Sequence, residues 1–478
     1  MRIVLPSLVA FLVGGAVIFD PASAQAAVDA APHLDGASLG LLWTVPFASM
    51  LLSIALLPLL MPHFWHHHFG KGALFWALCF LVPALLEFGL PTVTYEVLHV
   101  VLLEYLPFVI LLFSLFTVAG GVRLTGALHG SPLLNTALLA SGTFLASIMG
   151  TTGAAMLLIR PLIRANEGRK HKVHTVVFFI FLVANIGGSL TPLGDPPLFL
   201  GFLKGVSFFW TTKHLMLPML AMAGILLIIY FVLDLVFYRR EGQKKPMVDP
   251  EDRIGIEGKI NILLLGGVVG TVLMSGLWPH DYRWQISVFY VPVEIQNVTR
   301  DVLLLLLAYL SWKLTSRESR TANAFNWFPI IEVGKLFFGI FMTIIPVIAI
   351  LKAGAHGTLA PVVHAVTDAN GEPINEMYFI LTGLLSSFLD NAPTYLVFFN
   401  TAGGDAEVLM HEVSTLMAIS CGAVFMGANT YVGNAPNFMV KSIAEERGVK
   451  MPSFFGYMLW SFGLLGPLYV VLVYLFFT

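Results

Sequence analysis

Two carboxylates stand in apolar stretches that glycine and proline interrupt. Asp195 ends the segment N-I-G-G-S-L-T-P-L-G-D, and Asp390 stands in S-F-L-D-N-A-P. An acidic side chain at membrane depth is costly and commonly marks an ion or proton path. Removal from water favours the neutral form of a carboxyl group, so a proton and a metal cation can compete for it. We therefore expect Asp195 and Asp390 to hold Na⁺.

Hydroxyl and amide side chains flank these two carboxylates. A hard cation prefers a shell of carboxylate, amide, hydroxyl and carbonyl oxygens. An alternative role for the hydroxyls is to cap helix breaks and to hold helices together. The candidate ion- or substrate-binding residues are Asp195, Asp390, Asn391, Asn185, Thr191, Ser189, Thr151, Thr152, Asn429, Thr430 and Asn434.

The same segments contain residues that break helices. An unbroken helix over 173–203 would be about 46 Å long, whereas the hydrocarbon core of a bilayer is roughly 30 Å thick. Proline removes a backbone donor and glycine permits non-helical dihedral angles. A break at membrane depth is tolerated where its carbonyls line a cavity or meet protein. The predicted helix-break residues are Gly187, Gly188, Pro192, Gly194, Pro393 and Gly433.

The composition places these segments in a membrane. Of 478 residues, 57% are hydrophobic and 11% are charged, whereas soluble domains have about 25% charged residues. This excludes a soluble globular protein, and a net charge of −2 gives no nucleic-acid footprint. The chain has no ATP-binding loop of the form G-x-x-x-x-G-K-[ST]. We expect a secondary transporter without a cofactor, and not an enzyme.

We predict an all-α polytopic membrane protein with about ten transmembrane helices. Two further apolar stretches, about 131–160 and 377–400, have polar and glycine residues near their middles and are predicted to be re-entrant hairpins. The predicted spans lie at about 38–60, 72–89, 95–119, 173–203, 214–238, 259–278, 300–314, 329–352, 413–440 and 455–477.

The distribution of basic residues supports this layout. With both hairpins re-entrant, the basic loop 160–172 lies inside and the loop 401–412, which has no Lys or Arg, lies outside. Residues 1–26 resemble a signal peptide with an A-x-A cleavage site at Ala24–Ala26. An uncleaved first span is the alternative. We expect a periplasmic mature N-terminus in a bacterial-type inner membrane.

The predicted spans divide into two similar halves, residues 27–245 and 246–478. Each half has five spans with a hairpin after the third, and an odd number of spans makes the repeats inverted. The separation from Ala154 to Gly194 is 40 positions, and that from Ala392 to Gly433 is 41. Broken apolar segments at matching places in two halves indicate a transporter binding site.

At N-I-G-G-S-L-T-P-L-G-D-P-P and L-D-N-A-P the chain resembles the ion-transporter superfamily. That group holds NhaD-type sodium/proton antiporters, arsenite pumps and citrate or dicarboxylate carriers. The antiporter motif D-N-x-P falls on Asp390, Asn391 and Pro393, and the motif N-x-G-G-x-x-x-P-x-G-D falls on 185–195. The likeness covers most of residues 38–477. It implies a homodimer in which a hairpin-bearing transport domain moves against a scaffold.

Two functions agree with these features. The first is secondary active exchange of a monovalent cation, Na⁺, for protons by alternating access. The alternative is cation-coupled uptake of an organic anion such as citrate, held at half-helix N-termini. Carboxylate carriers of the superfamily have Ser-Asn-Thr tips, which neither Met149–Thr152 nor Leu389–Asn391 provides. Some citrate carriers are nevertheless similar to this chain.

Overall fold

The computed structural model describes residues 17–19, 31–126, 128–242, 255–279 and 284–478. These residues are mostly helical, with short strands in two small sheets. The predicted all-α class is therefore confirmed. The predicted cleavage site, Ala24–Ala26, lies outside the described residues.

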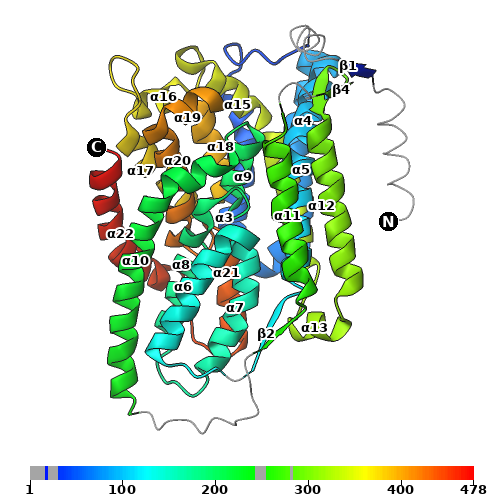
Figure 1. Cartoon of the computed structure of the whole chain (residues 1–478). Helices are drawn as coiled ribbons and strands as arrows, with labels where there is room; N and C mark the ends of the chain where they lie inside the picture. The colour runs from blue at the N-terminus through cyan, green and yellow to red at the C-terminus, as the bar shows by residue number, and fades with distance from the viewer. Residues whose placement is uncertain (1–16, 20–30, 127, 243–254, 280–283) are drawn as a thin grey trace.

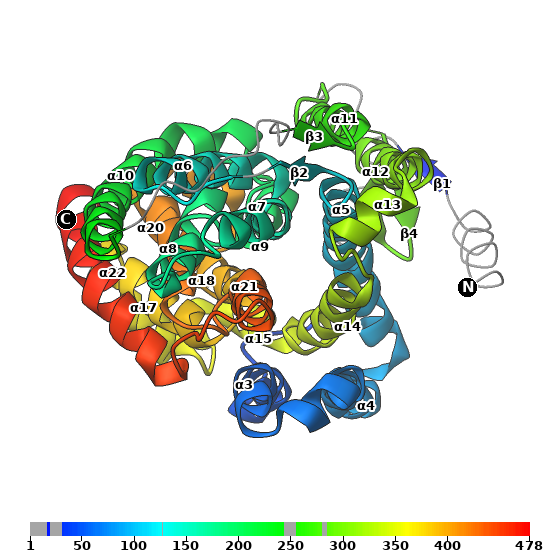
Figure 2. The ribbon, with the colours of Figure 1, turned by 90° about the horizontal axis from the view of Figure 1, so that it is seen from below.

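One set of helices forms a curved row along one side of the molecule (Figures 1 and 2), called the scaffold row here. In this row α3 packs on α4, α4 on α14, α5 on α12 and α12 on α11. Its members are α3 (Val45–Leu60), α4 (Pro62–Val100), η2 (Val101–Tyr105), α5 (Leu106–Ala119), α11 (Ile260–Gly276), α12 (Ile295–Leu314), α13 (Arg317–Ala322) and α14 (Phe328–Thr343).

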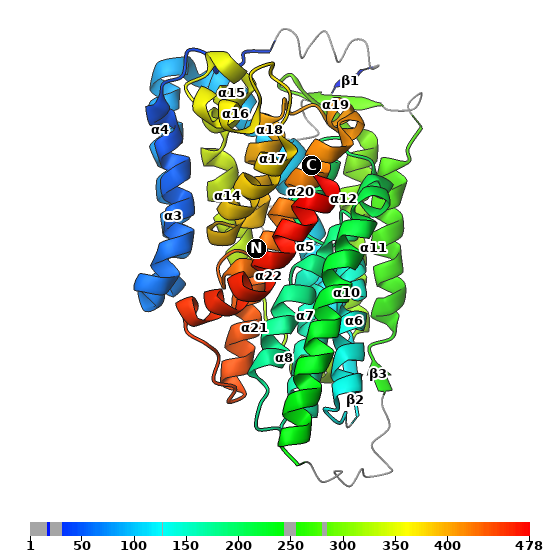
Figure 3. The same cartoon turned by 90° about the vertical axis from the view of Figure 1, so that its left-hand side faces the viewer.

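A second set of helices forms a bundle on the concave side of this row (Figure 2). The bundle consists of α6 (Pro132–Met149), α7 (Thr151–Ala165), α8 (Val173–Leu182), η3 (Ile186–Leu190), α9 (Pro196–Leu203), α10 (Phe208–Arg240), α17 (Asn375–Phe388), α18 (Asn391–Thr401), α20 (Val413–Met426), η6 (Gly427–Asn429), α21 (Ala435–Glu446) and α22 (Phe454–Phe476). Helices α10 and α22 cover its face away from the scaffold row (Figures 2 and 3).

Short elements connect these two sets. Strand β1 (Val17–Phe19) pairs antiparallel with β4 (Gln285–Val288), which also pairs antiparallel with β5 (Val291–Glu294). After α5, β2 (Arg123–Thr125) pairs antiparallel with β3 (Gly255–Glu257), with Arg123 opposite Glu257. The remaining short helices are η1 (Leu41–Thr44), α15 (Ile345–Lys352), η5 (Gly354–His356), α16 (Ala360–Val366) and α19 (Ala406–His411).

Within the described ranges, six stretches are long and apolar enough to cross a membrane. There are up to seven if α14 and α15, which are bent by 42°, count as one span. Other predicted crossings are shortened or merged. The run Pro62–Ala119 contains two predicted spans, 72–89 and 95–119, and the kink at Gly89 (φ +78°) lies where the first of them ends. The apolar helices Ile260–Gly276 and Val413–Asn429 are shorter than 18 residues.

The chain visits the scaffold row and the bundle twice, in the same order. Helices α3 to α5 lie in the row and α6 to α10 in the bundle; α11 to α14 return to the row and α17 to α22 to the bundle. In each visit to the bundle, a hairpin precedes a broken helix and one long helix ends the visit. This order supports our proposal that residues 27–245 and 246–478 are inverted repeats.

The proposed orientation is tested by labelling at two exposed positions, Lys170 and Glu407. We introduce Lys170→Cys or Glu407→Cys after replacing the native Cys79 and Cys421. An impermeant maleimide should label position 407 in intact cells, and position 170 only after permeabilisation, because basic loops stay on the cytoplasmic side. Labelling of position 407 only in permeabilised cells would contradict the inverted layout.

Candidate functional site

Both predicted hairpins pack against the predicted broken helices. Helices α6 and α7 turn at Gly150, whose φ of +81° is readily available only to glycine. Helices α17 and α18 turn through Leu389 and Asp390. The first hairpin contacts η3 and α21, and the second contacts α9 and α20. Each hairpin therefore contacts both broken helices.

The second half of each broken helix starts with an extended residue whose side chain does not cap it. Asp195 (φ −143°, ψ 143°) precedes α9, and Asn434 (φ −150°, ψ 138°) precedes α21. Proline at the first positions of both helices suits a helix start. A Cβ at Gly194 would come 2.1 Å from the carbonyl oxygen of Gly188. Glycine thus allows the broken chain to cross itself, while Asp195 and Asn434 point to neighbouring elements.

The carboxylate of Asp195 is the centre of the site. Its Oδ1 accepts hydrogen bonds from Thr151 Oγ1 at 3.0 Å and Asn434 Nδ2 at 3.3 Å. Its Oδ2 accepts a hydrogen bond from Asn391 Nδ2. Asp195 is 1% exposed. Its donors come from both hairpins and from the other broken helix, and among the described ion pairs none involves Asp195.

A chain of amides continues from this carboxylate. Asn434 Nδ2 also donates to Asn185 Oδ1 at 3.2 Å, and Asn185 Nδ2 donates to Asn437 Oδ1 at 2.7 Å. Asn437 Nδ2 donates to the carbonyls of Gly427 at 2.8 Å and Thr430 at 2.9 Å. Asn437 was not among the sequence candidates. The sequence signal that could have identified it is its position one helical turn after Asn434.

Two predicted threonines fasten the hairpins to the breaks. Thr191 Oγ1 donates to the Ser147 carbonyl, and Thr430 Oγ1 donates to the Ser387 carbonyl at 2.5 Å. The serine hydroxyls add to this contact, since Ser147 Oγ donates to the Gly187 carbonyl at 2.5 Å. These bonds agree with the alternative, structural role considered for the hydroxyls.

Other predicted ligands also form their hydrogen bonds with groups other than Asp195. Ser189 Oγ donates to the Ile186 carbonyl at 2.8 Å. Asn429 Nδ2 donates to Ser387 Oγ at 2.9 Å, and its Oδ1 accepts from Tyr469 at 3.1 Å. Thr152 is partly exposed on the first turn of α7. The structure brings Thr151, Asn391, Asn434 and, through Asn434, Asn185 to the central carboxylate.

Asp390 and Asn391 have different surroundings. Asp390 is partly buried, and its Oδ1 accepts from the backbone N–H of Ala392 at 3.1 Å, which caps α18. Asn391 is completely buried, and its Oδ1 has no hydrogen-bond partner among the described residues. A buried acceptor without a partner is costly. Because Asn391 also bonds to Asp195, this oxygen is a candidate cation ligand beside the carboxylate.

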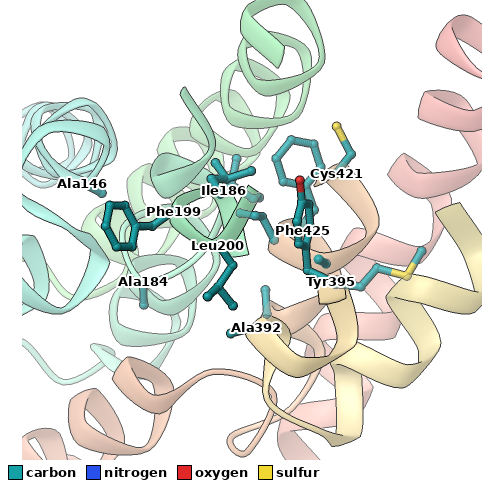
Figure 4. Packing of buried hydrophobic residues seen from close by; sticks show 14 of the residues in the cluster. Ala146, Ala184, Ile186, Phe199, Leu200, Ala392, Tyr395, Cys421 and Phe425 are labelled. Atoms are coloured by element: carbon teal, nitrogen blue, oxygen red, sulfur yellow. The ribbon is translucent and has the colours of Figure 1, made fainter. Parts of the chain in front are cut away.

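Tightly packed apolar side chains surround these polar groups. Figure 4 shows Ile186 and Leu200 of the first broken helix between Phe199 on one side and Ala392 and Tyr395 of the second hairpin on the other. All five are almost fully buried. Little water reaches such a core, so electrostatic interactions with Asp195 are stronger than at a surface.

Asn437→Ala tests whether the Asn437 side chain stabilises the two helix breaks. It leaves the Asn185 amide and two backbone carbonyls without this partner, and each unpaired buried polar group costs about 1–3 kcal/mol. We expect the melting temperature of the purified protein to fall by at least about 4 °C. Asn370→Ala, in an exposed loop, is the control and should leave it unchanged. Equal melting temperatures for the two variants would show that Asn437 does not stabilise the helix breaks.

The comparisons with known proteins agree with this architecture. The family model described as "Putative citrate transport" matches residues 36–477. A search of curated proteins finds no significant match. Because the family model covers nearly the whole chain, this multi-pass membrane protein belongs to the family described as "Putative citrate transport".

Proposed function

We propose that the protein is a secondary active transporter that exchanges a monovalent cation, Na⁺, for protons at Asp195. The observation that carries this proposal is a fully buried carboxylate held only by neutral donors from three other segments. A cation can satisfy that negative charge, and so can a proton. One group can therefore bind either ion, as exchange requires.

The neighbouring side chains suit both states of the carboxylate. The Thr151 hydroxyl donates to Asp195, but its oxygen can also accept a hydrogen bond or bind a cation. The amides of Asn391 and Asn434 can turn to present their carbonyl oxygens in place of N–H groups. Together with Asp195 they would give Na⁺ an all-oxygen shell, which hard cations prefer.

The arrangement of the helices suits alternating access. The residues that hold Asp195 belong to the bundle, on α7, α18 and the start of α21. Movement of the bundle against the scaffold row would therefore carry the site as a unit from one side of the membrane to the other. We retain the homodimer and the bacterial inner membrane as parts of this proposal.

Uptake of a carboxylate such as citrate, coupled to cations, is the second candidate. The family description favours it. In addition, α7, α9, α18 and α21 begin at the crossing of hairpins and breaks, and helix N-termini attract anions. Against it, the carboxylates of Asp195 and Asp390 lie at two of these helix starts and would repel a substrate carboxylate. We therefore favour cation exchange.

Asp195→Asn tests the role of the carboxylate. We expect it to abolish ²²Na⁺ exchange in proteoliposomes, because a neutral amide cannot trade a proton for a cation. Asp405→Asn replaces an exposed aspartate and serves as the control, with exchange at the wild-type rate. Near-normal exchange by Asp195→Asn would reduce that residue to a structural role at the helix break.

Competition between ions separates the two candidate functions. If protons and Na⁺ share the site, a fall in pH fills it with protons and weakens apparent Na⁺ affinity. The dependence should approach about one decade per pH unit where one proton is displaced per ion. Asp195→Asn should lose this dependence, because it removes the carboxyl group that the two ions share, whereas Asp390→Glu should keep some exchange, since it retains the charge.

Calorimetry of the purified protein with NaCl at several pH values, with and without citrate, measures this competition. Exchange predicts pH-dependent Na⁺ binding in the absence of citrate. Strong citrate binding, with no pH-dependent Na⁺ binding when citrate is absent, would favour the second candidate and reject the first.

A further inference from the structure

A buried ion pair joins the scaffold row to the bundle. Lys204 Nζ lies 2.5 Å from Glu104 Oε1, and the two side chains are 18% and 5% exposed. Glu104 lies in η2 of the scaffold row, and Lys204 is the residue that ends α9 in the bundle. The other described ion pairs of the bundle, such as Arg169–Asp234, lie within it. Movement of the bundle relative to the scaffold row would therefore change the distance between Glu104 and Lys204.

The local backbone presents Glu104 to α9. Residues Val101–Tyr105 form a π-helix between α4 and α5, a wider turn that is frequent at functional sites. Helix α9 packs against both η2 and α5. Glu104 Oε2 is buried without a hydrogen-bond partner among the described residues. Lys204 is its ion-pair partner, and Lys352 and His99 also lie within electrostatic range of the carboxylate.

Helix α9 connects this ion pair to the central carboxylate. Asp195 is its N-cap and Lys204 its C-cap, nine residues later, so the two are about 13.5 Å apart along the axis. A Cβ at Gly201 would lie 2.3 Å from the Tyr395 hydroxyl of α18. Such close packing ties α9 to the helix that begins at Asn391. A displacement of Asp195 with α18 would therefore move Lys204 as well.

A cavity lies in the interface between the scaffold row and the bundle, near the α13 end of the scaffold row. A cavity of about 200 Å³ lies between Phe116 and Pro329 of the scaffold row and Met156, Arg160 and Ile443 of the bundle. It reaches residues that directly follow α13, and Figure 1 shows α9 and α18 above α7 and α21. Arg160 Nη1 is buried there without a partner among the described residues. The two parts thus touch at the ion pair of α9 and also between α5 and α7, where Phe116 and Met156 belong to one packed apolar cluster and the cavity lies beside them.

We propose that the Glu104–Lys204 ion pair is a gate contact of the transport cycle. It holds α9 against the scaffold row in the conformation that has the cavity beside Arg160, and it separates when the bundle moves relative to the row. Separation leaves each buried charge without its partner until water or another group reaches it, so intermediate positions are unfavourable. Two discrete positions of the bundle follow from this. The inference rests on the proposed alternating access, and it holds for either candidate substrate.

The test measures the rate at which a thiol reagent reaches the cavity at Met156. Met156→Cys is introduced after replacement of Cys79 and Cys421, and labelling is followed in detergent without substrate. Glu104→Gln weakens the closed contact, so the cavity closes more often and labelling should slow by about tenfold. Lys204→Gln should act in the same direction. Because Lys204 is 18% exposed, it provides a second variant if Glu104→Gln does not fold.

Charge exchange distinguishes a gate from a merely structural contact. Glu104→Lys combined with Lys204→Glu restores an ion pair across the interface, and should return labelling to within about threefold of the parent rate. Glu257→Gln, which removes the exposed Arg123–Glu257 pair between β2 and β3, is the control and should leave the rate unchanged.

Folded single variants that label at the parent rate would overturn the proposal. A double variant no faster than the singles would overturn it as well. Because no substrate is present, these results do not depend on the identity of the transported ion. The exchange assay of Asp195→Asn therefore tests the proposed function, and the labelling test of the gate contact is independent of its result.

Discussion

The burial of one ionisable carboxylate constrains the rest of the structure. An isolated charge in an apolar interior is very costly unless hydrogen bonds, a counter-ion or a proton compensate it. Asp195 receives hydrogen bonds from Thr151, Asn391 and Asn434, and is in none of the described ion pairs. Its remaining compensation can come from a small cation or a proton. The cost of burial is thus also the source of affinity for those ions.

The helix breaks exist to make this arrangement possible. An unbroken helix would keep its backbone groups paired and would direct its side chains away from its own axis. At Asp195 and Asn434 the chain is extended and then starts a new helix, which turns both side chains toward each other. Close approach of Gly194 to Gly188 permits the crossing. The threonines at both breaks tie it to the hairpins, so the breaks and the hairpins form one connected site.

The sequence predicted the positions of the helix breaks and hairpins better than it predicted which side chains bond to one another at the site. Glycine, proline and polar residues inside apolar stretches predicted both breaks and both hairpins, because such residues are unfavourable in a lipid-facing helix. They placed Thr151, Asn391 and Asn434 near the break, but gave no means to separate them from Thr191 and Thr430, which bond to backbone. Hydroxyl chemistry is the same in both roles, and only the packing decides between them. Asn437 was missed for a similar reason, since a single asparagine beyond a helix start has many possible partners.

Contacts between distant segments were beyond the reach of sequence spacing. Glu104 and Lys204 are 100 residues apart, and neither belongs to a motif. Their pairing follows from the way the chain leaves the scaffold row, builds the bundle and returns. The number of crossings was similarly difficult to predict, because kinks such as that at Gly89 divide long helical runs and because some apolar helices are short. Periodicity and hydropathy describe each segment alone, whereas the gate arises from two segments that meet only after folding.

The most direct test of a cation site at Asp195 is a crystal structure of the protein soaked with Tl⁺, whose anomalous scattering locates a monovalent cation. We expect an anomalous peak in contact with the Asp195 carboxylate and the Asn391 side-chain oxygen, with the Thr151 hydroxyl oxygen turned toward the ion. A peak elsewhere, with Asp195 still bonded to Thr151, Asn391 and Asn434, would contradict a cation site at Asp195.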